Sequence, residues 1–254
     1  MKTVVIVSDL HCGSTYGITP PSEFKSSHNR DIQEEAWNEY VRMTQQWARP
    51  DVLICNGDAI EGNQSLQGGA ELITPDRSVQ CDMAITALEA WQARKIFMTY
   101  GTAYHVGKDA EDFERGIATA LGAEIEGHLY LRVEGLTFDI RHKVGTSAVP
   151  HGRATALLRE MLWALVKEAG DTGPKVDVVI RSHAHYSIVV KQPGKLAVIT
   201  PGLQLARGRF GARECTGEIH WGAVRLTVDR GKIIQEDYDI CKLAANKPRI
   251  FKVK

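Results

Sequence analysis

The sequence predicts an α/β protein whose second half is rich in strands. Apolar runs typical of buried strands alternate with amphipathic helical segments as far as residue 121, and from about residue 128 short strands predominate. The chain has 254 residues, which is enough for a substantial core, and no repeat or linker divides it. We therefore expect one domain spanning residues 1–254.

The first predicted strand runs into a polar turn. Four apolar β-branched residues, at positions 4–7, are followed by Ser8, Asp9 and His11. Side chains two apart on an extended segment point the same way, so Asp9 and His11 can converge on one cation. Taken alone, such a pair is more often a loop-capping Asp beside a surface His.

Helix and strand patterns then alternate. A stretch rich in Gly, Pro and Ser at 13–29 precedes the first predicted helix. Apolar spacing predicts helices at 32–47, 79–91 and 109–121, and apolar runs predict strands at 51–55 and 96–100. Asp58 follows the second strand and His105 follows the third. Parallel strands joined by helices end at one edge of a sheet, where α/β proteins bind ligands.

The second half adds further polar strand ends. We expect a hairpin at 129–140 around Glu134-Gly135, a helix at 154–169, and a strand at 176–180. Later strands are expected at 188–191, 196–200, 223–228 and 233–238. His142 follows the hairpin, and His183 and His185 follow the strand at 176–180.

Two acids and five imidazoles thus follow predicted strands. They are Asp9, Asp58, His11, His105, His142, His183 and His185. A single His near a strand end is usually a satisfied surface or core residue, but five in succession favour a shared site. Their convergence would be costly unless one or two divalent metals coordinated them. Nitrogen and oxygen ligands without thiolate favour Mn, Fe or Zn over Ca or a structural zinc.

With these residues the sequence resembles the calcineurin-like metallophosphoesterases. The matching segments, in the family's order, are Asp9-Leu10-His11, Gly57-Asp58, Gly101 to His105, His142, and Ser182-His183-Ala184-His185. The resemblance implies two mixed β-sheets packed as a sandwich and flanked by helices. It also implies a phosphoester substrate, for which a nucleic acid or a nucleotide is a candidate.

The resemblance further implies a dinuclear centre. Asp9, His11 and His185 would hold one ion, Asp58 would bridge both, and His142 and His183 would hold the second. The two divalent ions are expected to be Mn²⁺, with Fe, Zn or Ni as alternatives, and to share a hydroxide that attacks phosphorus in line. The expected function is phosphoester hydrolysis by a phosphodiesterase or nuclease. The alternatives are a phosphomonoesterase acting on nucleotides or proteins, and a non-catalytic interaction module.

The third motif departs from the family pattern of Gly-Asn-His. Here Gly101-Thr102-Ala103-Tyr104-His105 has no Asn, and it resembles a variant found in phage and prophage members. Thr102 or a water fills the missing ligand position, or His105 itself binds the second metal. We favour His105 as an acid or a transition-state donor, a role that His151 could also fill.

Three further residues are candidates for substrate binding. Arg181 stands where the family usually has Gly, and it either contacts phosphate or pairs with an acid. His151 and Arg153 form a phosphate-site candidate or merely cap the following helix. The segment 207–213, with three Arg and Phe210, either grips a nucleic-acid backbone or is a solvated loop.

Composition limits the remaining possibilities. Lys+Arg and Asp+Glu both number 31, so no net charge favours nucleic acid or a membrane. The five cysteines are odd in number and widely spaced, which favours reduced thiols. No apolar run approaches ~18 residues and no leader pattern is present. We expect a cytoplasmic protein, in the host cytoplasm if phage-encoded, with no membrane partner; the sequence leaves its oligomeric state open.

Overall fold

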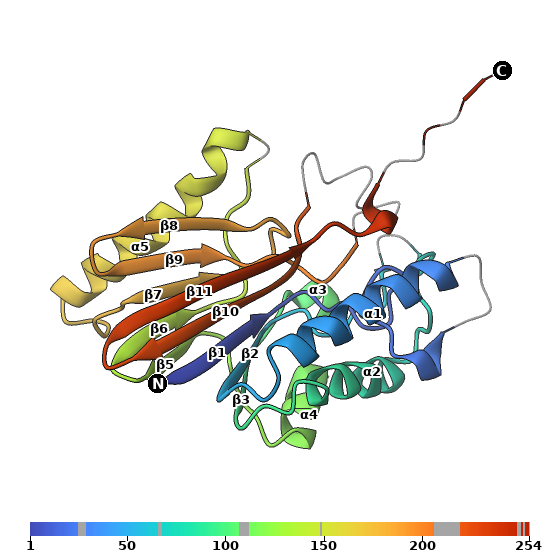
Figure 1. The fold of residues 1–254 in the computed structure, drawn as a ribbon, viewed down its shortest axis with the longest axis horizontal. Helices are drawn as coiled ribbons and strands as arrows, with labels where there is room; N and C mark the ends of the chain where they lie inside the picture. The colour runs from blue at the N-terminus through green and yellow to red at the C-terminus, as the bar shows by residue number, and fades with distance from the viewer. Residues whose placement is uncertain are drawn as a thin grey trace.

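Two mixed β-sheets lie at the centre of the computed structural model (Figure 1). The structure describes residues 1–24, 29–65, 68–106, 112–147, 149–205, 219–247, 250 and 252–253. In spatial order the first sheet contains β11 (Lys232–Cys241), β10 (Trp221–Asp229), β1 (Lys2–Val7), β2 (Val52–Asn56), β3 (Ile96–Thr99) and β4 (Glu124–Glu126). The second contains β5 (Leu129–Val133), β6 (Leu136–Ile140), β7 (Val178–Arg181), β9 (Lys195–Ile199) and β8 (Ile188–Gln192).

Parallel strands fill the middle of both sheets. β1, β2, β3 and β4 are parallel, and so are β6, β7 and β9. The antiparallel pairs β10–β11, β5–β6 and β8–β9 form the other edges. The carboxyl ends of the parallel strands are the places where ligands bind in open sheets, so both sheets offer such an edge.

Helices cover the two outer faces (Figure 1). α1 (Arg30–Gln46), α2 (Arg77–Glu89) and α4 (Phe113–Ala120) pack on the first sheet, and α5 (Arg153–Ala169) packs on the second. α3 (Ala103–Val106) is one short turn after β3. Single 3₁₀ turns occur at Pro21–Glu23, Pro150–Gly152 and Ala244–Asn246. The predicted α/β class, with two mixed sheets flanked by helices, is confirmed.

Strand β1 shows why its apolar run is continuous. Val4 and Ile6 pack between the sheets, whereas Val5 and Val7 pack against the helices of the first sheet. Successive side chains of a strand alternate between its faces, so a strand covered on both sides needs apolar residues at every position. All four side chains are fully buried.

The structure differs from the sequence expectations in a few elements. The helix expected at 109–121 runs only from Phe113 to Ala120, because Asp112 caps it by accepting a hydrogen bond from the Arg115 amide at 2.9 Å. Strand β4 and helix α3 were not expected, since each is too short to show a period. The arginine-rich segment 207–213 lies outside the described residues. Within the described part of the chain, no helix has the length and apolarity needed to cross a membrane.

A chain of buried hydrogen bonds joins strand ends of the two sheets. Thr99 Oγ1 donates to Asn56 Oδ1, and Asn56 Nδ2 donates to Ser182 Oγ, each at 2.6 Å. The hydroxyls of Ser182 and Thr200 lie 2.6 Å apart, and those of Thr200 and Ser8 lie 2.9 Å apart. All five side chains are fully buried. This series of hydrogen bonds therefore fixes the ends of β3, β2, β7, β9 and β1 relative to one another.

Thr200 is the place to test this chain. Thr200→Val keeps the side-chain shape but leaves Ser8 and Ser182 without the hydroxyl they share. We expect the free energy of unfolding to fall by about 2 kcal/mol in urea titrations, the cost of buried unsatisfied polar groups. Thr86→Val, on the exposed side of α2, should change it by less than about 0.5 kcal/mol. Equal effects of the two substitutions would contradict this role.

Candidate metal centre

Five of the six predicted metal ligands lie in tight turns with left-handed backbone. The φ angles are 54° at Asp9, 47° at His11, 52° at Asp58, 69° at His183 and 54° at His185. Such angles are uncommon for residues other than Gly, and they cluster at functional sites. Each of these turns follows β1, β2 or β7, so five left-handed residues lie at the ends of these three strands.

The first group of ligand atoms comes from Asp9, His11 and His185, which lie within 4.8 Å of one another. His185 Nε2 is 3.2 Å from Asp9 Oδ1, and His11 Nε2 is 4.0 Å from the same oxygen. Asp9 is fully buried. The structure thus brings together the three residues expected to hold one ion.

The second group combines Asp58, His142 and His183 with Asp9. His142 Nε2 lies 2.9 Å from Asp58 Oδ2, and His183 Nδ1 lies 4.0 Å from it. His142 Nδ1 lies 2.7 Å from the Asn56 carbonyl oxygen, so it carries the proton and Nε2 faces the carboxylates. Asp9 is common to both groups of atoms. The expected bridge through Asp58 stays a prediction.

Four buried atoms at this site have no partner with hydrogen-bond geometry among the described residues, and they are Asp9 Oδ1, His11 Nδ1, His11 Nε2 and His142 Nε2. Three of them still have an ion-pair neighbour: Asp9 Oδ1 lies 3.2 Å from His185 Nε2, His11 Nδ1 lies 2.8 Å from Glu61 Oε2, and His142 Nε2 lies 2.9 Å from Asp58 Oδ2. Buried polar atoms are nearly always hydrogen-bonded, so a buried cluster that lacks this geometry requires an explanation. Carboxylate and imidazole lone pairs directed at one region fit a divalent cation.

The charges at the site suit a cation. Burial opposes ionisation of Asp9 and Asp58, yet neighbouring imidazoles outweigh it, and the pKa of each carboxyl lies well below its usual value. Burial lowers the pKa of His183 to about 4. Burial also disfavours the charged form of His142, but Asp58 raises its pKa to about 10. Metal binding would therefore displace a proton from His142.

Two glycines allow the polar groups to approach so closely. A Cβ on Gly57, which has φ of 79°, would collide with the His142 ring, and one on Gly101 would collide with the Asp58 carboxylate. These contacts explain why Gly precedes Asp58 and Thr102 in the sequence.

Thr102 holds Asp58 in place. Its backbone N–H donates to Asp58 Oδ1 at 2.6 Å, and its hydroxyl lies 3.2 and 3.3 Å from the two carboxylate oxygens. In this structure the Thr102 hydroxyl thus contacts a predicted ligand, Asp58.

Glu114, which the sequence did not single out, joins the turns that follow β2 and β3. Its carboxylate accepts hydrogen bonds from the backbone amides of Ala59 (3.0 Å) and Gly101 (2.7 Å). Burial raises the pKa of the Glu114 carboxyl to about 7.

Glu61 connects two of the histidines. Its Oε2 lies 2.8 Å from His11 Nδ1, and its carbonyl oxygen lies 2.9 Å from His105 Nδ1. The rings of His11 and His105 meet edge to face, with 4.5 Å between centroids. Glu61 lies three residues after Asp58, a spacing that does not by itself reveal these contacts.

His105 therefore lies beside His11. It forms a group with His11 and Glu61, not with His142 and His183. The alternative in which His105 completes the second metal site gains no support from this grouping. Burial, together with the nearby charge of His11, lowers the His105 pKa below its ordinary value. Its catalytic role stays a prediction.

Arg181 requires a correction. It is fully buried, with Nη1 2.8 Å from Asp139 Oδ1 and Nη2 2.9 Å from Glu160 Oε2. Its guanidinium ties β7 to β6 and α5 in the core. Of the two alternatives for Arg181, the structure supports pairing with acids and gives no surface for substrate contact, because Asp139 and Glu160 face it from neighbouring elements.

Arg153 and His151 lie at the start of α5. The Arg153 guanidinium lies over the Tyr186 ring, 4.6 Å from its centroid, and Tyr186 follows His185 directly. His151 is exposed. Substrate binding by either residue stays a prediction. The cysteines near the site, Cys12 and Cys55, are fully buried in the core, where they pack as small apolar side chains.

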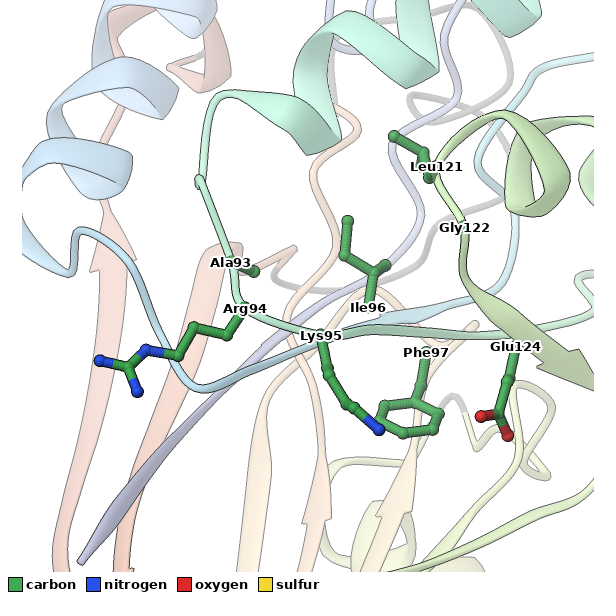
Figure 2. A pocket seen from close by; sticks show the side chains of 8 residues that line it. All are labelled: Ala93, Arg94, Lys95, Ile96, Phe97, Leu121, Gly122 and Glu124. Atoms are coloured by element: carbon green, nitrogen blue, oxygen red, sulfur yellow. The ribbon is translucent and has the colours of Figure 1, made fainter.

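A hollow of about 260 Å³ lies at the opposite end of β3 (Figure 2). Ala93, Arg94, Lys95, Ile96, Phe97, Leu121, Gly122 and Glu124 line it. In the view of Figure 2, Phe97 lies between the side chains of Lys95 and Glu124. None of the predicted metal ligands lines this hollow, so it is separate from the candidate metal centre.

Comparisons with known proteins give no family assignment. No protein-family model and no curated protein matches the chain. Among solved structures, Vps29 of Entamoeba histolytica complexed with zinc is 12% identical and covers 94% of this chain and 98% of its own, with a TM-score of 0.44. An archaeal phosphodiesterase is 15% identical (94% and 99% covered, TM-score 0.45). A predicted phosphoesterase of Streptococcus pneumoniae is 11% identical (90% and 83%, TM-score 0.40). At these values function must be argued from the residues themselves.

Glu61 offers a test of the candidate centre. Glu61→Gln keeps the side-chain shape but removes the charge beside His11, and loss of such support typically lowers metal affinity by about 10- to 100-fold. We expect that loss in Mn²⁺ titration calorimetry. The control is Glu126→Gln, at an exposed position at the end of β4, which should bind Mn²⁺ like the parent. Parent-like affinity of Glu61→Gln would show that Glu61 does not support the centre.

Proposed function

We propose that this protein is a metal-dependent phosphoester hydrolase with a dinuclear metal centre. The observation that carries the proposal is the convergence of buried Asp and His side chains in two groups of possible ligand atoms, which share Asp9 and in each of which the atoms lie within 4.8 Å of one another. The sequence resemblance supplies the reaction class, since the same residues match the metallophosphoesterase motifs. Asp9, His11 and His185 would hold one ion, and Asp58, His142 and His183 the other, with Mn²⁺ as the expected metal.

Bound divalent ions would neutralise phosphate charge and activate a water molecule for attack. Residues next to the predicted ligands fix the tautomer and orientation of those ligands. The Asn56 carbonyl fixes the tautomer of His142, and Thr102 fixes the Asp58 carboxylate. Glu61 orients His11 in the same way. Ligands held in one tautomer and orientation bind without reorganisation.

His105 is the proposed proton donor to the leaving group. Its Nδ1 is engaged by the Glu61 carbonyl, so any proton exchange with substrate takes place at Nε2. General acid catalysis by an imidazole typically contributes ~100- to 10,000-fold in rate. The ring lies against His11, which places it beside the first group of ligands.

We further propose a phosphodiester substrate, such as single-stranded nucleic acid. The support is the arginine-rich segment 207–213 and the third motif, which resembles that of phage-type members.

We also propose that the protein acts in the cytoplasm. Its four described cysteines are free thiols, which suits a reducing compartment.

The test uses Asp58→Asn and a substrate panel. With Mn²⁺ added, we expect the parent to cleave single-stranded DNA and a bis-aryl phosphodiester faster than nucleotides or an aryl phosphomonoester. Asp58→Asn should lose bound metal and at least about 100-fold in rate on every substrate. The control, Asp82→Asn on the exposed side of α2, should behave like the parent.

Each outcome separates one part of the proposal. Full activity of Asp58→Asn would refute the assigned centre. A preference for monoesters would overturn the diester assignment but leave the hydrolase. Metal binding without hydrolysis of any phosphoester would favour the non-catalytic interaction module.

A further inference from the structure

The connection from β6 to α5 and the first turns of α5 carry cations and no acid. From residue 141 to residue 159 the sequence contains Arg141, Lys143, Arg153 and Arg159 but neither Asp nor Glu. The whole chain has 31 basic and 31 acidic residues, so this stretch departs from the balance of the rest. It also includes His142, a predicted metal ligand. A local excess of positive charge beside a candidate site attracts anions.

Most of these cations are not neutralised by an acid. Arg141 forms an ion pair with Glu160. For Lys143, Arg153 and Arg159, by contrast, no ion pair occurs within the described part of the chain. Lys143 and Arg159 are exposed and Arg153 is half-buried. We call these three residues the cationic rim, and their charges are available to a ligand.

Contacts with neighbouring turns hold the cationic rim beside the candidate metal centre. The Arg153 guanidinium carbon lies 4.6 Å from the ring centroid of Tyr186, which directly follows His185. Arg159 extends back over Gly145 in the β6–α5 connection, where an added Cβ would be 3.2 Å from Arg159 Nη2. The rim thus adjoins the turn after β7 and the turn after β6, and both turns carry predicted ligands.

Arg153 is the most constrained member of the rim. Stacking on an aromatic ring holds a guanidinium in one plane and leaves its outer N–H groups able to donate. Arg153 Nε is buried and has no hydrogen-bond partner among the described residues. The fold therefore positions this charge without supplying an internal acceptor, and a partly buried charge is costly when nothing compensates it. A bound anion would supply that compensation.

The first turn of α5 favours the same kind of ligand. α5 begins at Arg153, and Gly152 at its N-cap forms no side-chain capping hydrogen bond. The N-terminus of a helix carries partial positive charge and amide N–H groups that bind phosphate. The guanidinium of Arg153 also matches phosphate, because its N–H groups can donate to two oxygens at once. Together these groups fit an anion with several acceptor oxygens.

An anion on the cationic rim would lie next to the metal positions, not on them. The Tyr186 side chain packs beneath α5 with Val144 and Leu157. The neighbouring His185 side chain instead places its Nε2 3.2 Å from Asp9 Oδ1. These two side chains thus leave their turn in different directions. No residue of the rim belongs to a group of possible metal ligands in the described structure.

We propose that the cationic rim binds an uncleaved phosphate of a polynucleotide strand whose scissile phosphate lies at the metal centre. A strand carries a phosphate at every nucleotide, so a strand held at the centre places a second phosphate beside it. A simple diester has no second phosphate to place there. The inference rests on the proposed hydrolase function for the position of the scissile bond. Its binding test requires no hydrolysis, so the two proposals can fail separately.

The salt dependence of binding measures the phosphate contacts of the rim. Fluorescence anisotropy of labelled hexathymidylate is followed in EDTA, which removes divalent metal, at several KCl concentrations. Each phosphate contact on a single strand contributes about 0.7 to the slope of log Kd against log salt concentration. Arg153→Gln should therefore lower the slope by about 0.7, whereas Arg153→Lys, which keeps the charge, should retain it. The control, Arg132→Gln at an exposed position of β5, should also retain it.

Substrate selectivity measures the same contact during turnover. The dinucleotide TpT has a single phosphate, so nothing remains to reach the rim when that phosphate is at the metal centre. With Mn²⁺ added, we expect the parent to have at least about 10-fold higher kcat/KM per bond on hexathymidylate than on TpT, the size of a hydrogen bond to a charged group. Arg153→Gln should lose this ratio and Arg132→Gln should keep it. Circular dichroism of each variant verifies its fold.

The outcomes separate the rim from the metal centre. Equal slopes for the parent and Arg153→Gln overturn the proposal, and so does a parent that does not bind hexathymidylate. Equal kcat/KM per bond of the parent on the two substrates also overturns it. If neither substrate is hydrolysed but the slope changes as expected, the proposed function fails and the rim stands as a polynucleotide-binding surface.

Discussion

The buried hydrogen-bond chain from Thr99 to Ser8 is the constraint on which the site depends. It crosses from the first sheet to the second through Asn56 and Ser182 and returns through Thr200. All of the predicted metal ligands except His142 lie one to three residues beyond Ser8, Asn56 or Ser182. Buried hydroxyls and amides that satisfy one another allow little relative movement. This series of hydrogen bonds therefore holds the turns that follow strands of the two sheets at fixed separations.

The electrostatics of the site follow from that geometry. Buried carboxylates and imidazoles are held within a few ångströms of one another, and Asp9 Oδ1, which lies 3.2 Å from His185 Nε2, has no partner with hydrogen-bond geometry among the described residues. Burial alone would drive carboxyls to their neutral form, yet the imidazoles keep the pKa of Asp9 and Asp58 low. A cation could bind the oxygen and nitrogen atoms of this cluster, with loss of a proton from His142, whereas an apolar ligand could not. The folded chain thus presents a site whose chemistry fits a metal better than any uncharged molecule.

Much of the fold and of the site could be predicted from the sequence, for identifiable reasons. β1 was evident because a strand buried on both faces must be apolar at each position, and α5 because its apolar residues repeat at helical spacing. Asp9, His11 and Asp58 were evident because each follows such a strand directly. The structure brings these residues together with His142, His183 and His185, as their positions at strand ends suggested.

The remainder depended on contacts between distant segments. Glu61 and Glu114 support the site through partners that spacing along the chain does not reveal. Arg181 was expected to follow a strand as the histidines do, but it is the last residue of β7, and its guanidinium pairs with Asp139 and Glu160 in the core. The sequence of α5 alone also does not show which of its apolar side chains meet the sheet, as Leu157 does, and which are exposed, as Leu162 is.

The central claim is that the Asp and His residues bind metal ions in two neighbouring positions. Anomalous diffraction from crystals grown with Mn²⁺ tests it most directly, because the signal locates the metal independently of activity. The account predicts two peaks, one among Asp9, His11 and His185 and one beside Asp58 and His142. Crystals in which Mn²⁺ scatters elsewhere, or not at all, while these side chains keep their positions would contradict it.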